Sequence, residues 1–180
     1  MTWVIWITGL PGCGKTTIAQ LVRDMLSERG INAKILQLDE IRQVITPHPT
    51  YKDDERDIVY ASLAYMAKLL AESGTNVIVD ATAYRRKYRD LARHLVPEFA
   101  EVYVNAPLEV CMERESARKA GFAPTKIYNK AQKEDATVPG ANVIYEEPLA
   151  PDVIVDSYAM DALKCAEIIT DSICSKFGHR

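Results

Sequence analysis

A glycine-rich segment near the start of the chain constrains its fold most. Residues 9–16 read Gly-Leu-Pro-Gly-Cys-Gly-Lys-Thr, a glycine, four free positions and then Gly-Lys-Thr. In this pattern the backbone N–H groups of the loop surround phosphates. An apolar run at 4–8 precedes the segment, and apolar residues at helical spacing follow it as far as Gly30. The order strand, loop, helix predicts a nucleoside triphosphate site at a helix N-terminus.

The loop residues have separate expected roles. Lys15 supplies a cation to the outer phosphates of ATP or GTP, and the Thr16 hydroxyl holds Mg²⁺. Cys13 is the one cysteine whose thiol we expect near the phosphates, since the other three read as reduced packing thiols without a C-x-x-C pair. The predicted nucleotide-binding residues are Gly9, Gly12, Cys13, Gly14, Lys15, Thr16 and Thr17.

Length and composition predict one globular domain over residues 1–180. Apolar residues make up 48% of the chain and charged residues 26%, which is ordinary for a soluble protein. The net charge of −3 gives no basic surface for nucleic acid. No apolar run is long enough to span a bilayer and no signal peptide fits. We therefore expect no nucleic-acid or membrane partner and a cytoplasmic location.

Strand and helix signals alternate along the chain, which predicts an α/β fold. We expect a P-loop NTPase fold with a mainly parallel five-stranded sheet and helices on both faces. Residues 121–150 lack periodicity and are rich in proline and charge, so we expect a lid or binding segment there. The predicted strands cover 4–8, 33–38, 76–80, 101–104 and 152–156. The predicted helices after the first cover 40–45, 58–72, 86–96, 107–119 and 159–177.

A switch-type GTPase and a kinase compete as the class of P-loop protein. Guanine selection commonly uses Asn-Lys-x-Asp, and the nearest match, residues 129–132, reads Asn-Lys-Ala-Gln and lacks the Asp. No Asp precedes a Gly at the spacing of a switch glycine. The sequence therefore favours a kinase, and a non-catalytic ATP-binding regulator stays open as a further alternative.

Charged residues near the ends of predicted strands support the kinase interpretation. Asp39 follows the second predicted strand and Asp80 ends the third, and ligands of open α/β sheets bind at that edge. Either carboxylate can hold Mg²⁺ or accept the proton of an acceptor hydroxyl, or it can simply cap a helix. Arg42 and Arg56 can bind an anionic acceptor through paired hydrogen bonds, or be solvated surface arginines.

The order of these motifs resembles the adenylylsulfate kinase family from about Val4 to Asp156. The most specific stretch is residues 99–111, Phe-Ala-Glu-Val-Tyr-Val-Asn-Ala-Pro-Leu-Glu-Val-Cys. It is similar to the family's Phe-x-Glu-Val-(Phe/Tyr)-Val-x-x-Pro-Leu-Glu-Val-Cys. Residues 127–131 and 145–148 are similar to the family's lid motif and the Tyr-Glu-x-Pro that follows it. The resemblance implies transfer of phosphate from ATP, with Mg²⁺, to the ribose 3′-hydroxyl of adenylyl sulfate. Dimerisation is common in the family, so a homodimer is one expectation.

The resemblance also implies roles for matched residues. It gives Asp39 a metal and base role, Arg42 and Arg56 an acceptor-binding role, Tyr51 a stacking role on the acceptor adenine, and Lys130 an approach to the phosphates. Arg114 and Arg118 lie before the lid, where they either reach the transferring phosphoryl group or only solvate a charged helix. The predicted catalytic set is Lys15, Asp39 and Lys130, and the predicted metal set is Thr16, Asp39 and Asp80.

Several departures leave the acceptor open. The family's Asp and Gly before Asp39 are Gln37 and Leu38 here, and its lid Phe-Thr-Gly is residues 138–140, Val-Pro-Gly. Thr82 stands where the family has a serine described as a phosphorylated site. Residues 77–82 are also similar to a wider group that includes polynucleotide-kinase-like proteins. The alternative acceptor is another nucleotide-linked or small metabolite, for example a cytidine-diphosphate derivative. The family's asparagine and paired arginines after Arg56 are also replaced here, by Val59, Ala61 and Ser62.

Overall fold

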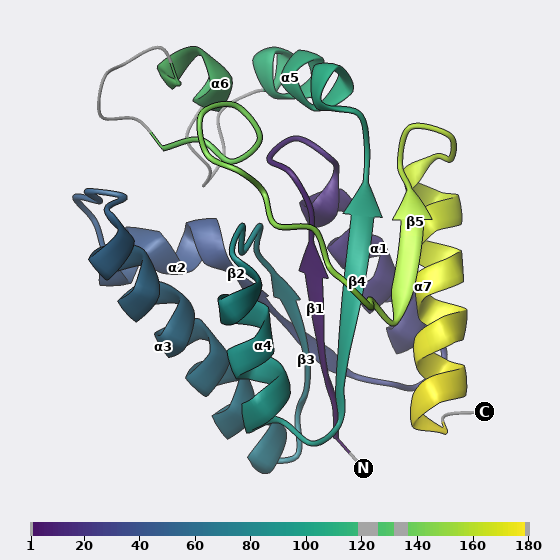
Figure 1. The fold of residues 1–180 in the computed structure, drawn as a ribbon. Coiled ribbons are helices and arrows are strands. Elements are labelled where there is room, and N and C mark those ends of the chain that lie inside the picture. Colours follow the sequence, from purple (N-terminus) through teal and green to yellow (C-terminus); the bar gives the residue numbers. More distant parts are fainter. Residues whose placement is uncertain (1, 119–125, 132–136, 179–180) are drawn as a thin grey trace.

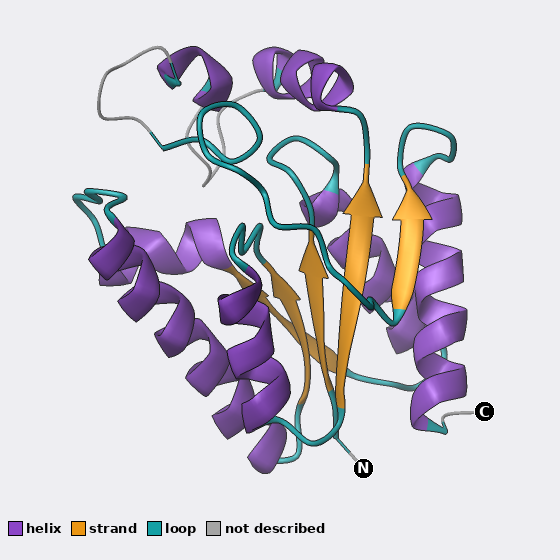
Figure 2. Cartoon of the chain, in the orientation of Figure 1, coloured by secondary structure: helices purple, strands orange, loops and turns teal. Residues whose placement is uncertain are grey.

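A five-stranded sheet forms the centre of the computed structural model, which describes residues 2–118, 126–131 and 137–178 (Figure 1). The sheet order is β2-β3-β1-β4-β5 and all four pairings are parallel. The carboxyl ends of the strands therefore meet at one edge of the sheet, on the side where α5 and α6 lie (Figure 2). The strands are β1 (Val4–Thr8), β2 (Ala33–Gln37), β3 (Asn76–Asp80), β4 (Phe99–Asn105) and β5 (Val153–Asp156).

Helices cover both faces of the sheet, as predicted. Alternate residues of a strand point to opposite faces, so Ile5 and Ile7 join the core under α1 and α7, whereas Val4 and Trp6 join the core under α3 and α4. No helix in the described part of the chain combines the length and apolar character needed to cross a membrane. The helices are α1 (Lys15–Glu28), α2 (Leu38–Ile45), α3 (Asp53–Glu72), α4 (Arg86–Leu95), α5 (Leu108–Ala117), α6 (Ile127–Lys130) and α7 (Ala162–Phe177).

Several element boundaries differ from the predictions. Helix α2 begins at Leu38, so Asp39 lies in its first turn and not at the end of a strand. Helix α3 begins at Asp53, five residues before the predicted start at 58, because three acidic residues form its first turn and complement the helix dipole. Helix α6 lies within the segment expected to be irregular. Of the expected lid, residues 121–125 and 132–136 lie outside the described residues.

A buried arginine holds the loop after β3 in place. The Arg89 side chain is 1% exposed, and its Nε donates to Glu101 Oε1 at 2.5 Å. Its Nη2 donates to the Glu146 carbonyl at 2.6 Å, and its Nη1 donates to the Ala83 carbonyl. Ala83 has a φ of 44°, a left-handed conformation that is unfavourable for alanine. Arg89 therefore joins α4, β4 and the segment around Glu146 to the loop that follows Asp80.

Candidate active site

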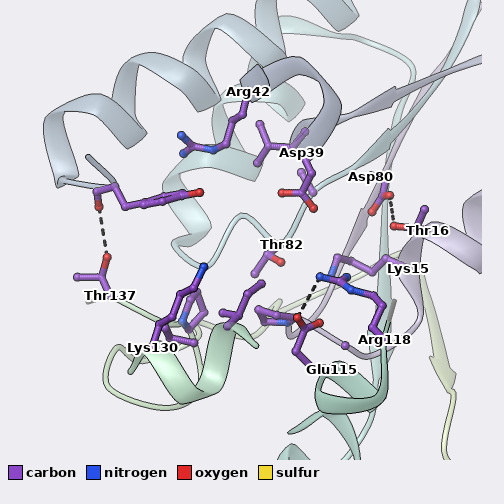
Figure 3. A pocket seen from close by; sticks show the side chains of 18 of the residues that line it. Lys15, Thr16, Asp39, Arg42, Asp80, Thr82, Glu115, Arg118, Lys130 and Thr137 are labelled. Carbon is purple, nitrogen blue, oxygen red and sulfur yellow. Dashed lines mark hydrogen bonds and ion pairs between the residues drawn. The ribbon is translucent and has the colours of Figure 1, made fainter. Parts of the chain in front are cut away.

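A cavity of about 440 Å³ opens at the carboxyl edge of the sheet (Figure 3). Its wall includes the glycine-rich segment 9–16, which we call the P-loop, and the end of β3. The other parts of the wall are the start of α2, the loop before α3, the end of α5, α6 and residues 137–139. Segments that are distant in the sequence thus contribute to one site. The predicted site residues that line it are Gly12, Gly14, Lys15, Thr16, Thr17, Asp39, Arg42, Tyr51, Arg56, Asp80 and Lys130.

The P-loop has the tight backbone that its glycines predict. Gly12 and Gly14 have φ values of 86° and 100°, in the region that side-chain-bearing residues rarely adopt. A Cβ at Gly12 would also strike the carbonyl oxygen of Cys111. Lys15 is buried, and its ammonium group donates to the carbonyl oxygens of Gly9 and Leu10, each at 3.0 Å. The loop therefore satisfies its own buried cation.

The Cys13 thiol lies 3.9 Å from the Lys15 ammonium nitrogen but does not face the cavity. The side chain is fully buried in the core under α1 and α7, and it does not line the cavity. Burial raises the pKa of the Cys13 thiol, so the thiol is neutral and packs as a small apolar group. Gly9 does not line the cavity either, and it contributes a carbonyl to Lys15. The Cys13 backbone carbonyl also accepts from Ser157 Oγ at 2.7 Å.

Thr16 and Asp80 form a pair of oxygen donors beside Lys15. Thr16 Oγ1 donates to Asp80 Oδ2 at 2.6 Å, and the Asp80 residue is 5% exposed. Burial raises the pKa of Asp80, whereas the Lys15 charge and the Thr16 hydrogen bond lower it. Hydroxyl and carboxylate oxygens suit Mg²⁺, which usually takes only one or two carboxylates and completes its shell with phosphates and water. The described residues contain no cluster of three or more His, Cys, Asp or Glu that would hold a metal by themselves, and this pair fits a nucleotide-bound Mg²⁺.

Asp39 faces the cavity from the first turn of α2. Burial raises its pKa, and the charges of Lys15, Arg118 and Arg42 lower it. A carboxylate whose pKa is raised is a better proton acceptor than an ordinary exposed aspartate. Asp39 and Asp80 therefore offer two carboxylates in one cavity, and only Asp80 is bonded to Thr16.

Two arginines flank an aromatic ring on the α2–α3 side of the cavity. The guanidinium carbons of Arg42 and Arg56 lie 5.1 and 5.9 Å from the centroid of the Tyr51 ring. Arg42 Nη1 donates to Glu55 Oε1 at 3.1 Å, and Arg56 Nη2 donates to the carbonyl and hydroxyl oxygens of Thr137 at 2.7 and 2.8 Å. The Nε of Arg56 is buried and has no hydrogen-bond partner within the described residues. This side of the cavity thus offers positive charge, an aromatic face and an unused donor.

The opposite wall comes from α5 and α6. The hydroxyl of Tyr128 donates to the Pro11 carbonyl at 2.7 Å, which fixes α6 on the P-loop and places Lys130 along the cavity. Arg114 lines the cavity and its Nη2 donates to the Ser157 carbonyl at 2.8 Å. Arg118 also lines the cavity. Both arginines therefore face the cavity, and whether they reach the phosphoryl group stays a prediction.

Sequence reasoning missed three residues of the site. Glu55 accepts hydrogen bonds from Arg42, Thr50 and the backbone of Tyr51, and Thr137 accepts from Arg56. Glu115 is 1% exposed and lines the cavity. The signal for Glu115 was its spacing of three residues from Arg118 on a predicted helix. No pattern marked Thr137, because its contacts join segments 81 to 86 residues apart.

A parallel sheet with a P-loop, a Thr–Asp oxygen pair and a separate cationic, aromatic wall defines a P-loop kinase. The family model for adenylylsulphate kinase matches residues 1–156. This chain belongs to the adenylylsulfate kinase family.

The names of similar curated proteins are consistent with this family assignment. A probable adenylyl-sulfate kinase from Pyrococcus abyssi is 36% identical over 168 residues, covering 93% of this chain and 92% of the relative. The adenylyl-sulfate kinase of Bacillus velezensis is 33% identical, with coverage of 94% and 84%. Among solved structures, the Mycobacterium tuberculosis APS kinase CysC in complex with AMPPNP and APS superimposes with a TM-score of 0.83 at 29% identity. That match covers 96% of this chain and 97% of the neighbour.

Proposed function

We propose that this kinase transfers the γ-phosphoryl group of ATP to the 3′-hydroxyl of adenylyl sulfate. The observation that carries the proposal is a single cavity in which the P-loop faces Tyr51 with Arg42 and Arg56 beside it. A nucleotide acceptor with anionic groups needs an aromatic face for its base and guanidinium groups for its charge. The relatives named adenylyl-sulfate kinase, and the neighbour solved with AMPPNP and APS, support this acceptor.

The donor end uses residues 9–17. The phosphates replace the Gly9 and Leu10 carbonyls as partners of the Lys15 ammonium group, and the backbone N–H groups of the loop bind the phosphate oxygens. Thr16 and Asp80, with Asp39 facing them, would hold Mg²⁺, which when bound neutralises charge on the β- and γ-phosphates. Lys130 approaches the same phosphates from α6.

At the acceptor end, Asp39 takes the proton of the 3′-hydroxyl. The acceptor oxygen then forms a bond to the γ-phosphorus, while the bond from that phosphorus to the bridging oxygen breaks and its electron pair leaves with ADP. Arg56 offers its unused Nε to the anionic part of the acceptor, and Arg42 is held ready by Glu55. Fixed partners of this kind lower the cost of orienting the acceptor.

One departure in the acceptor site affects affinity. Val138 lines the cavity where the resembled family has a phenylalanine, so the acceptor base stacks on Tyr51 alone. Loss of one aromatic stacking partner costs about 1–3 kcal/mol by analogy with bases stacked on single-strand-binding proteins. We expect a higher KM for adenylyl sulfate than a two-sided stack would give, and Val138→Phe should lower it.

A coupled assay of ADP release tests the acceptor. The panel contains adenylyl sulfate, cytidine-diphosphate derivatives, nucleosides and free serine, each with ATP and Mg²⁺. We expect adenylyl sulfate to stimulate ADP release most, and Lys15→Ala to abolish that stimulation. Stimulation by another acceptor and none by adenylyl sulfate would reject the proposed substrate. ATP binding without turnover on any acceptor would favour a non-catalytic regulator.

The homodimer and the cytoplasmic location stay predictions.

A further inference from the structure

An ion pair at the end of α5 lies in the cavity wall. Arg118 Nη2 donates to Glu115 Oε1 at 3.0 Å, with the Glu115 side chain 1% exposed and that of Arg118 36% exposed. A surface pair at this spacing stabilises a helix by only about 0.2–0.5 kcal/mol. Burying a carboxylate costs several kcal/mol unless partners compensate, and Glu115 Oε2 has no hydrogen-bond partner among the described residues. Helix stabilisation alone therefore does not explain a glutamate at this position.

The side chain of Arg118 lines the same cavity as both aspartates of the site, Asp39 and Asp80. Figure 3 shows Arg118 joined to Glu115 in the wall of the pocket that also holds Lys15 and Asp39. Lys15 and the Thr16–Asp80 pair converge on the same region. Arg118 thus adds a cation where the proposed reaction places the transferring phosphoryl group.

We propose that Arg118 is a catalytic residue that contacts the transferring phosphoryl group and that Glu115 is the positioning residue that aims it. The inference rests on the proposed function only in requiring phosphoryl transfer from ATP, not in the choice of acceptor. Negative charge on the phosphoryl oxygens in the transition state is stabilised by a cation already in place. Because Glu115 fixes one amino group of Arg118 before nucleotide binds, little reorganisation is needed during the reaction.

A structural role for Glu115 is the competing explanation. Burial raises the pKa of Glu115, whereas the charge of Arg118 and the backbone of Ile127 lower it, so the carboxylate also interacts with the start of α6. A purely structural role predicts that Glu115→Gln lowers the unfolding midpoint and leaves kcat unchanged wherever the protein is folded. A positioning role predicts that kcat falls while the protein remains folded.

The first experiment compares steady-state rates of Arg118→Ala, Arg118→Lys, Glu115→Gln and the Glu115→Gln/Arg118→Ala double variant. The control is Glu167→Gln, which removes an exposed pair of the same spacing on α7, Lys164 Nζ to Glu167 Oε2 at 2.9 Å. We expect Arg118→Ala to lower kcat about 100- to 1,000-fold with acceptor KM within about twofold, as for loss of one transition-state donor. Arg118→Lys should recover little of the kcat lost in Arg118→Ala, because lysine lacks the planar guanidinium fork. Guanidinium ion added to Arg118→Ala should restore part of the rate.

Glu115→Gln should lower kcat about tenfold, since misplaced groups lose rate without losing binding. It should cause no further loss in the Arg118→Ala background, because the two residues act as one unit. The control should match wild type. Unchanged kcat in Arg118→Ala, or additive losses in the double variant, would overturn the inference. So would a Glu115→Gln variant in which only the unfolding midpoint falls.

A binding measurement decides the inference without any acceptor. Calorimetry compares AMPPNP, which carries a γ-phosphate, with ADP, which does not. Arg118→Ala should weaken AMPPNP at least about tenfold and ADP by less than about twofold, because a charge-assisted hydrogen bond to the γ-phosphate is lost. Equal weakening of both ligands, or of neither, would overturn the role of Arg118. If wild type does not act on adenylyl sulfate but this difference appears, the proposed acceptor fails and the inference stands.

Discussion

Asp39 and Asp80 carry the same side chain in different surroundings. Asp80 ends β3, is almost fully buried and is bonded to Thr16, whereas Asp39 lies in the first turn of α2 and is only partly buried. Burial raises the pKa of both carboxyls. The hydrogen bond to Thr16 directs Asp80 toward metal binding, and the open face of Asp39 directs it toward the acceptor.

Substitution of these two residues should therefore affect different kinetic quantities. Asp39→Asn removes the proton acceptor, so we expect kcat to fall about 100- to 10,000-fold. Asp80→Asn keeps the shape but weakens a ligand of Mg²⁺, so we expect a smaller loss of kcat and a higher Mg²⁺ concentration at half-maximal rate. Rates measured across a Mg²⁺ titration separate the two. The reverse order of kcat losses would assign the base role to the residue on β3.

The sequence was informative about single residues only where chemistry and local pattern coincide. Lys15 and Thr16 belong to a contiguous motif, and Asp80 ends an apolar run, so each was a candidate from the sequence. The Cys13 thiol lies beside Lys15 but is buried in the core and does not face the cavity, and no local pattern gives that direction. Glu115 and Thr137 act through contacts with other segments, which a single sequence does not reveal.

The P-loop is the element whose backbone tolerates least change. In Gly12→Ala, the new methyl group meets the Cys111 carbonyl and the residue must keep a φ of 86°. We expect ATP affinity to fall at least tenfold, because the loop must shift by more than a hydrogen bond tolerates. Gly30→Ala is the control, since Gly30 also has a positive φ, 76°, but nothing lies within 4 Å of an added Cβ. It should cost about 1–2 kcal/mol of stability and leave ATP affinity unchanged.

Calorimetric ATP titration and urea denaturation of both glycine variants check this expectation. Equal ATP affinity in Gly12→Ala and wild type would show that the loop can relax around the added methyl group. It would then follow that the close approach to Cys111 does not shape the phosphate site.

Elements with a continuous apolar pattern were predicted well, and elements set by charge or long-range contact were not. The interior strands β1 and β3 are short apolar runs, and their predicted limits agree with the structure. The start of α3 was predicted too late because apolar periodicity ignores its acidic first turn. Helix α6 is one turn long and is held by Tyr128 on the P-loop, so its pattern is too short to detect.

On the scale of the whole molecule, the Arg89 network contributes stability through burial. Glu101→Gln leaves the Arg89 guanidinium buried without its carboxylate, so we expect a loss of about 3–5 kcal/mol in the free energy of unfolding. The matched control, Glu167→Gln, breaks an exposed pair and should change stability by less than about 1 kcal/mol. Urea denaturation measures both. A loss in Glu101→Gln no larger than in the control would mean that water or rearrangement satisfies Arg89.

The stability of the whole protein should depend on pH through Asp80. Its pKa is raised in the folded state, so the ionised form opposes folding, and this cost is lost as pH falls through the raised pKa toward the ordinary value of 3.8. Asp80→Asn should therefore raise the urea midpoint at pH 7.5, with a gain that shrinks on acidification.

Asp156→Asn is a control of opposite sign. The backbone N–H groups of Ala159 and Tyr158 lower the pKa of Asp156. This variant should be less stable than wild type at pH 7.5, and the difference should close as pH falls below 3.8. A midpoint for Asp80→Asn that lies below wild type at pH 7.5 would mean that the Lys15 charge outweighs burial.

The two carbonyl partners of Lys15 have a consequence for whether folding must wait for nucleotide binding. Because Gly9 and Leu10 already accept from the ammonium group, the chain can complete its folding before any nucleotide arrives. On nucleotide binding, the Lys15 ammonium group then exchanges backbone carbonyl oxygens for phosphate oxygens, and it is not an unpaired buried charge beforehand. A measured affinity for ATP therefore includes the free-energy difference between phosphate oxygens and backbone carbonyl oxygens as partners of the Lys15 ammonium group.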